Sequence, residues 1–238
     1  HKGGKFQKLC PLFEVIESFF YTSDEVTVGS CHVRDAIDLK RMMSVVLVAL
    51  IPCVVMGMYN TGFQANTALN DYGIVDQADV LAKVTGWRGT ALESIGLGFD
   101  NDNILDCLIH GALYFLPIYI VTMIVGIAWE MLFAVVRGHE INEGFFVTGL
   151  LIPLIMPANI PLWQVALATS FAVVVGKEIF GGTGRNFLNP ALAARAFLFF
   201  AYPGQISGGL SVWTAGNWMG VDGVSGATPL GAAAAAVP

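Results

Sequence analysis

The sequence predicts an all-α integral membrane protein, a multi-span helical bundle in which some helices are discontinuous or re-entrant. Of its 238 residues, 55% are hydrophobic and only 13% are charged, whereas ordinary globular domains carry about 25% charged residues. Several apolar stretches approach the roughly 20 residues of helix that cross a hydrocarbon core of about 30 Å. Other apolar stretches are short and broken by glycine and proline. Non-helical backbone at membrane depth must be covered by protein or line a cavity.

The first predicted span covers about residues 42–59 and is interrupted by Pro52; the second covers about residues 107–136. Between them, residues 60–105 form a predicted acidic loop, with six acidic side chains against two basic ones. Basic residues flank the spans at 34–41 and at Arg137. Because cytoplasmic flanks carry the excess of Lys and Arg, these flanks are expected inside and the loop in the periplasm.

After Arg137 the apolar segments become short, at about 150–156, 163–176 and 191–202. A polar, glycine-rich stretch at 177–190 separates the last two. In transporters, helices interrupted in this way point to the binding site; the alternative is re-entrant loops with only a packing role. Counting the crossings returns 177–190 to the inside and leaves Thr228 outside.

We therefore expect three parts. These are a cytoplasmic N-terminal segment (1–41), a transmembrane helical domain (42–202) and a periplasmic loop (203–238), after which the chain is expected to continue. With only 12 Lys and Arg and no basic run, the chain has no nucleic-acid surface. The four cysteines form no C-x-x-C pair and lie at no metal-ligand spacing with histidine, so no metal site is predicted.

The C-terminal motif Asp222-Gly-Val-Ser225-Gly226-Ala227-Thr228 has the pattern D-x-x-[ST]-G-A-T. It resembles the site at which a flavin transferase links FMN, through its phosphate, to a threonine hydroxyl. Thr228 would be the acceptor, and the small Gly226 and Ala227 would leave the backbone accessible to the transferase. Asp222 could bind a metal ion or orient the hydroxyl during modification. The alternative is a chance match in a Gly/Ala-rich loop.

The glycine-rich stretch Gly181–Pro190 fits neither the dinucleotide fingerprint nor a P-loop. It contains Asn186 and Asn189, whose amides offer both donors and acceptors. Such a pair suits the polar edge of a flavin ring or a ribityl chain. The alternative interpretation is a helix cap with turn glycines ahead of Pro190.

Glu130 is an acidic residue inside the second apolar span. Carboxylates within a membrane are costly, and they usually face a cavity, a partner or an ion path. The alternative is an interfacial residue paired with Arg137, two turns later on the same face, although helical rise separates their Cα atoms by about 10 Å.

Several segments together resemble the NqrB family, the B-type membrane subunits of the bacterial sodium-translocating NADH:quinone oxidoreductases. The resemblance runs from about residue 21 to Thr228, and the family's chains are longer, so we expect the first half of a larger, repeat-built subunit. The segments are His32-Val-Arg34-Asp35, Asp38-Leu39-Lys40-Arg41, Gly57-Met-Tyr59-Asn60, Tyr114-Phe-Leu-Pro117-Ile-Tyr119, Asn142-Glu143-Gly-Phe-Phe-Val-Thr148, Lys177-Glu178, Gly181–Ala191 and Arg195–Pro203.

The resemblance implies a multi-pass subunit of a six-subunit respiratory pump in the bacterial inner membrane, an NADH:ubiquinone reductase that exports Na⁺. Electrons would pass from covalent FMN on the periplasmic Thr228, through riboflavin, to ubiquinone at the cytoplasmic side. A flavin transferase would attach the FMN, and membrane lipid would surround the spans. The cofactors carry the redox chemistry, so no side chain is predicted to be catalytic.

The resemblance also implies roles for particular residues in binding riboflavin. Asn186 and Asn189 are the main candidates, and Thr148 and Lys177 are additional ones.

A further part of the resemblance concerns quinone and sodium. Gly126, Ile127 and Trp129 match the family's quinone-binding segment only in part, because Ile127 replaces the second glycine of the family's pair. The larger side chain would narrow the pocket or alter inhibitor sensitivity. Glu130 matches the family's candidate for sodium uptake.

Two other functions stay open from the sequence. One is the D-type subunit of an Rnf-like ferredoxin:NAD oxidoreductase, whose sequence after the Gly-Gly pair differs from Thr183–Asn189. The other is a membrane transporter without a redox role, which interrupted helices and an intramembrane acid would also suit.

Overall fold

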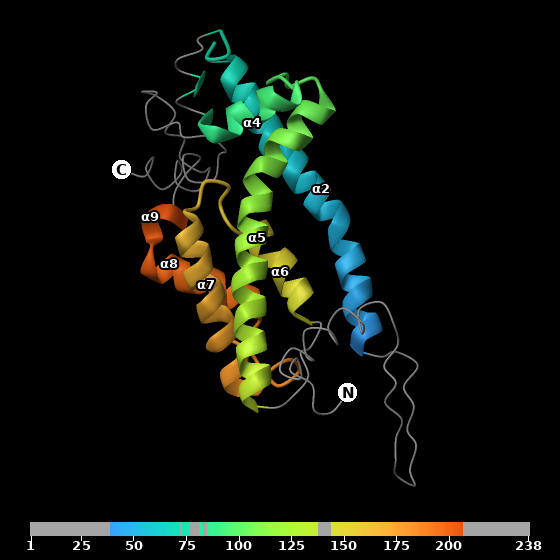
Figure 1. Ribbon diagram of the computed structural model, residues 1–238, viewed down its shortest axis with the longest axis vertical. Coiled ribbons are helices and arrows are strands. Elements are labelled where there is room, and N and C mark those ends of the chain that lie inside the picture. The colour runs from blue at the N-terminus through green and yellow to red at the C-terminus, as the bar shows by residue number, and fades with distance from the viewer. Residues whose placement is uncertain (1–38, 72, 77–80, 83–84, 138–143, 207–238) are drawn as a thin grey trace, which may run out of the picture.

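The computed structural model describes residues 39–71, 73–76, 81–82, 85–137 and 144–206, and these parts are helical without strands (Figure 1). The prediction of an all-α protein is therefore confirmed. The elements are α2 (Leu39–Asp71), α4 (Trp87–Ile95), α5 (Ile104–Arg137), α6 (Gly144–Leu154), α7 (Leu162–Val174), η2 (Glu178–Phe180), α8 (Pro190–Ala201) and α9 (Pro203–Ile206).

Three helical stretches are long and apolar enough to cross a membrane: Arg41–Asp71, Ile104–Arg137 and Leu162–Phe180. The apolar helices α6 and α8 have only 11 and 12 residues. At 1.5 Å per residue each covers little more than half of a hydrocarbon core of about 30 Å. Long spans combined with short apolar helices match the expected multi-pass protein with discontinuous helices.

Helices α2 and α5 cross with their backbones in direct contact at Gly62 and Gly111. A Cβ atom on Gly62 would lie 1.8 Å from the carbonyl oxygen of Cys107, and one on Gly111 would lie 1.7 Å from that of Met58. Small residues at a crossing let two membrane helices approach closely. This crossing sets α2 against the long central helix (Figure 1).

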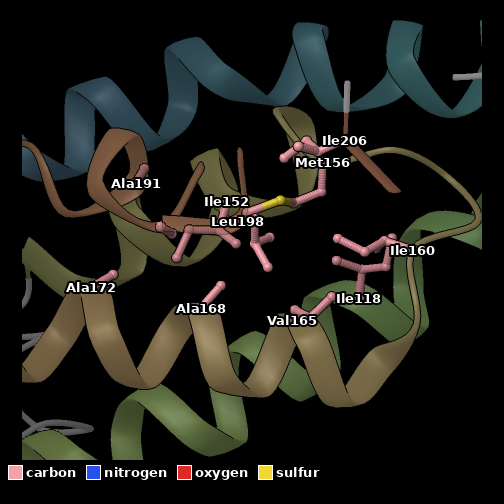
Figure 2. Close-up of a cluster of buried hydrophobic side chains, with 11 residues drawn as sticks. Ile118, Ile152, Met156, Ile160, Val165, Ala168, Ala172, Ala191, Leu198 and Ile206 are labelled. Atoms are coloured by element: carbon pink, nitrogen blue, oxygen red, sulfur yellow. The ribbon is translucent and has the colours of Figure 1, made fainter. Parts of the chain in front are cut away.

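The main hydrophobic core lies where α6, α7 and α8 meet the middle of α5. Figure 2 shows Val165, Ala168 and Ala172 of α7 facing Ile152 of α6 and Leu198 of α8. These five side chains are fully buried and belong to three helices that follow one another along the chain. Alanines on α7 and α8 keep these two helices close, so α6 packs against α5 and α7 packs between α5 and α8.

The expected loop over residues 60–105 is wrong in part. Helix α2 continues to Asp71, and α4 occupies Trp87–Ile95. Leu69, Leu92 and Phe99 form a second small core there, and the Asn70 amide donates to the carbonyl of Phe99 at 2.7 Å. Acidic side chains indicated a solvated loop, but the buried apolar residues between them stabilise helix.

Large apolar side chains on α2 and α5 are exposed over most of the length of both helices. They include Val45, Val48, Ile51, Met56, Ile120, Ile124, Leu132 and Val136. A soluble protein of this size rarely exposes so large a contiguous apolar area. In a bilayer the same side chains face lipid, which supports a multi-pass membrane protein.

Candidate functional site

The structure brings all four riboflavin candidates to one pocket. Thr148 of α6, Lys177 before η2, and Asn186 and Asn189 before α8 line a cavity of about 220 Å³. The remaining lining residues are Met43, Gly144, Val147, Leu151, Thr183, Gly184 and Pro190. Residues separated by up to 41 positions, from Thr148 to Asn189, thus converge at the end of the molecule where α5 reaches Arg137.

The glycine-rich loop makes one wall of this pocket because three of its glycines adopt positive φ angles. Gly181, Gly182 and Gly184 have φ values of 108°, 92° and 85°, a region that side chains with a Cβ rarely adopt. The loop turns back on itself, with the Gly182 amide donating to the Lys177 carbonyl at 3.2 Å. This turn places Thr183 against Gly144 at the start of α6.

Asn189 both lines the pocket and caps a helix, which was the alternative interpretation of the glycine-rich loop. Its Oδ1 atom accepts from the amide of Ala191 at 2.9 Å and caps α8, with Pro190 at the first helical position. Asn186 donates from Nδ2 to the carbonyl of Leu188 at 2.7 Å. Each amide therefore uses one of its polar atoms to shape the loop, and the other polar atom is the one that a ligand could engage.

Thr183 was not among the predicted site residues, yet it lines the same pocket. Its Oγ1 atom is buried and has no hydrogen-bond partner in the part of the chain that the structure describes. Buried hydroxyl groups are nearly always hydrogen-bonded. The sequence signal was its position directly after Gly181-Gly182, which needed the fold to place it beside Gly144.

Glu130 forms a buried ion pair with Lys177, and their side chains are 4% and 6% exposed. Arg137 instead pairs with Glu178 at 3.4 Å and donates to the Glu178 carbonyl at 2.7 Å. The alternative of a Glu130–Arg137 pair is therefore wrong, because the separation along one helix is too long. Partners from the segment after α7 replace it and join α5 to that segment.

The quinone candidates lie on α5, where that helix faces α6 and α7. Gly126 is buried, and a Cβ atom there would lie 1.8 Å from Cζ of Phe145. Ile127 and Trp129 are half-buried, and the Trp129 indole donates to Ser170 Oγ at 2.9 Å. Gly126 thus provides the space into which the Phe145 ring packs.

A second, apolar pocket of about 690 Å³ adjoins the first one at Asn189. Phe171, Phe187, Phe197 and Phe200 contribute its aromatic rings, and the rings of Phe171 and Phe197 stack at 4.7 Å between centroids. We did not predict these residues. The signal for them is the phenylalanine-rich sequence of α8, which looks like any other apolar segment until α7 and the loop are placed beside it.

The flavin motif lies outside the described residues, and with it Asp222, Ser225, Gly226, Ala227 and Thr228. Within the described residues, no group of three or more His, Cys, Asp or Glu side chains could hold a metal ion.

Comparisons with known proteins agree on one family. The sequence profile of the NQR2, RnfD, RnfE family matches residues 26–237. Relatives named as the B-type subunit of a Na(+)-translocating NADH-quinone reductase are 55% identical in Ectopseudomonas mendocina (strain ymp) and 55% identical in Azotobacter vinelandii (strain DJ / ATCC BAA-1303), each over 98% of this chain and 55% of the relative. The one from Klebsiella pneumoniae (strain 342) is 56% identical over 96% of this chain and 54% of the relative. The chain thus spans about half the length of these relatives.

Proposed function

Because the chain belongs to the NQR2, RnfD, RnfE family, we propose that it acts within a membrane subunit of a respiratory sodium pump, an NADH:ubiquinone reductase of six subunits. In this proposal electrons pass from covalent FMN through riboflavin to ubiquinone, and Na⁺ is exported. The relatives at 53–56% identity carry the name of the B-type subunit of such a reductase. That name favours the sodium pump over an Rnf-type subunit, although the family description includes RnfD.

The observation that carries the proposal is the pocket formed by Thr148, Lys177, Asn186 and Asn189. The Thr183 hydroxyl also lines this pocket and has no hydrogen-bond partner among the described residues. A flavin ring presents carbonyl oxygens and ring nitrogens along one edge, and these match amide, hydroxyl and ammonium groups. The volume of about 220 Å³ is below the range of about 300–1,000 Å³ for whole small-molecule pockets. We therefore assign these residues to one polar edge of riboflavin.

The other predicted residues complete the proposal. Thr228 accepts FMN within the motif that begins at Asp222, on the periplasmic side of the inner membrane, and residues 1–41 lie in the cytoplasm. Gly126, Ile127 and Trp129 contact ubiquinone, and Glu130 belongs to the sodium path. When bound, the two flavins and the quinone supply the electron-transfer chemistry. The chain positions them and excludes water.

Two kinds of flavin allow a crossed test in the full-length subunit. Thr183→Val and Asn186→Ala should lower the riboflavin that denaturation releases, while the flavin fluorescence that stays on the denatured chain is unchanged. Thr228→Ala should do the reverse. Thr169→Val is the matched control, because its hydroxyl is also buried without a hydrogen-bond partner among the described residues but lies outside the pocket.

Unchanged released riboflavin in both pocket variants would reject the pocket. Flavin that persists on the denatured Thr228→Ala chain would reject Thr228 as the attachment site. Equal losses in the pocket variants and in Thr169→Val would mean that the pocket variants act through stability alone.

A further inference from the structure

Lys177 belongs to two environments at once. Its ammonium group forms the buried ion pair with Glu130, and the same residue lines the pocket beside Asn186 and Asn189. Of the described residues that line this pocket, Lys177 is the one that carries a charge. An ammonium group with three donors and a flexible stem can serve two acceptors.

The neighbouring Arg137–Glu178 pair does not supply a charge to this pocket. Arg137 is held by the carbonyl and the carboxylate of Glu178, and neither residue lines the pocket. The two pairs together carry no net charge. A negative charge that enters the pocket would therefore compete with Glu130 for Lys177.

A buried carboxylate that loses its counter-ion is strongly unfavourable. Glu130 lies on the membrane helix α5 with 4% of its side chain exposed, so bulk water would compensate poorly for the loss of the ammonium group. Glu130 would then gain affinity for another cation, either a proton or a metal ion such as Na⁺.

We propose that Lys177 is a shared counter-ion which couples the charge of the ligand in the pocket to cation uptake at Glu130. The inference rests on the proposed function, because the covalent flavin supplies the electron and quinone accepts it. One electron adds one negative charge to the pocket. The Lys177 side chain turns toward that charge, and Glu130 binds one cation, so the balance of charge is preserved. When the electron leaves, Lys177 returns to Glu130 and the cation is released.

The test is a redox titration of the assembled complex, in which the pocket flavin is identified as the absorbance that Asn186→Ala removes. Lys177→Met should weaken the preference of the pocket for the reduced flavin at least tenfold, about 59 mV for a one-electron couple, and Lys177→Arg should retain it. Glu130→Gln should strengthen that preference at least tenfold. Glu178→Gln is the matched control, because it neutralises the acid of the neighbouring ion pair. Its preference for the reduced flavin should stay within about threefold of the wild-type value.

The identity of the cation follows from two further titrations. Raising Na⁺ a hundredfold against choline at constant ionic strength should favour the reduced flavin at least tenfold in the wild type and leave Glu130→Gln unchanged. A response to pH without a response to Na⁺ would assign a proton as the cation at Glu130.

The proposal would be overturned if Lys177→Met and Glu130→Gln both left the preference for the reduced flavin within about threefold of the wild-type value. Should Lys177→Met fail to assemble, Glu130→Gln alone decides. If Asn186→Ala removes the flavin while the couples of both charge variants are unchanged, the coupling between Lys177 and Glu130 is rejected and the pocket assignment stands. If Asn186→Ala and Thr183→Val both retain all flavin, the pocket assignment fails and takes the inference with it.

Discussion

Substituting Gly62 by alanine tests the crossing that places α2 against α5. The new Cβ atom would lie 1.8 Å from the carbonyl oxygen of Cys107 and 2.8 Å from the amide nitrogen of Gly111. Both neighbours are backbone atoms and cannot turn aside as a side chain does. To restore an ordinary contact of 3.4 Å the two helices must separate by about 1.6 Å, which opens the close packing along their length.

Overpacking of this kind costs about 1–3 kcal/mol or more, and it is partly offset by the gain of up to about 1 kcal/mol from alanine in a helix. We expect Gly62→Ala to destabilise the protein by a net of about 1–2 kcal/mol, or roughly 2–8 °C in the unfolding temperature. Gly57→Ala is the control in the same helix, since its Cβ atom would meet Leu154 at an ordinary 3.5 Å.

The assay is thermal unfolding of the purified full-length subunit in one detergent, at one scan rate because unfolding of such proteins is often irreversible. Gly57→Ala should unfold at or above the wild-type temperature, and Gly62→Ala clearly below it. Gly111→Ala should behave like Gly62→Ala, because its Cβ atom would meet the carbonyl of Met58 at 1.7 Å. Equal unfolding temperatures for Gly57→Ala and Gly62→Ala would show that backbone contact at the crossing does not limit stability.

Three further predictions concern the site. Asn189→Ala should destabilise α8 by about 1 kcal/mol, whereas Asn189→Asp keeps an oxygen that caps the helix and should retain that stability. Hydrogen exchange of the α8 amides measures both effects. Equal exchange rates in Asn189→Ala and the wild type would exclude a stabilising cap. Gly126→Ala should lower the unfolding temperature because its Cβ atom would lie 1.8 Å from the Phe145 ring. Adding Phe145→Leu to this variant should restore the unfolding temperature. A double variant that unfolds as early as Gly126→Ala would show that the strain does not arise from contact with Phe145. Glu178→Gln should cost less than about 1 kcal/mol in thermal unfolding. The Glu178 carboxylate is 3% exposed, but Arg137 is 35% exposed and keeps its bond to the Glu178 carbonyl, so little uncompensated charge is left buried. A larger loss would show that the charge itself is essential.

The spans were predictable because hydrophobicity is a property of each segment taken alone. The second span was expected over about 107–136 and is helical over Ile104–Arg137. The short apolar segment after Pro190 was expected to end at residue 202 and ends at Ala201. The structure of region 60–105 was harder to predict, because its acidic residues indicated a solvated loop although apolar residues between them, such as Leu69 and Leu92, are buried in a small core.

The site was predictable only as separate residues. The amides of the glycine-rich loop and the acid of the second span stand out in the sequence because polar groups in an apolar chain need a reason. Their neighbours do not stand out, since Thr183 resembles any loop hydroxyl and Gly126 any helical glycine.

The sequence alone was enough to predict an all-α membrane protein with long spans and short, interrupted helices. It also marked Asn186, Asn189, Lys177 and Glu130 as candidate functional residues. The folded arrangement was needed to show that Lys177, 47 positions from Glu130, is its partner, and that Thr183 faces the start of α6. Transfer free energies are local and add along a segment. Ion pairs and pockets depend instead on which segments lie side by side, and the glycine crossing and the shared core settle that arrangement.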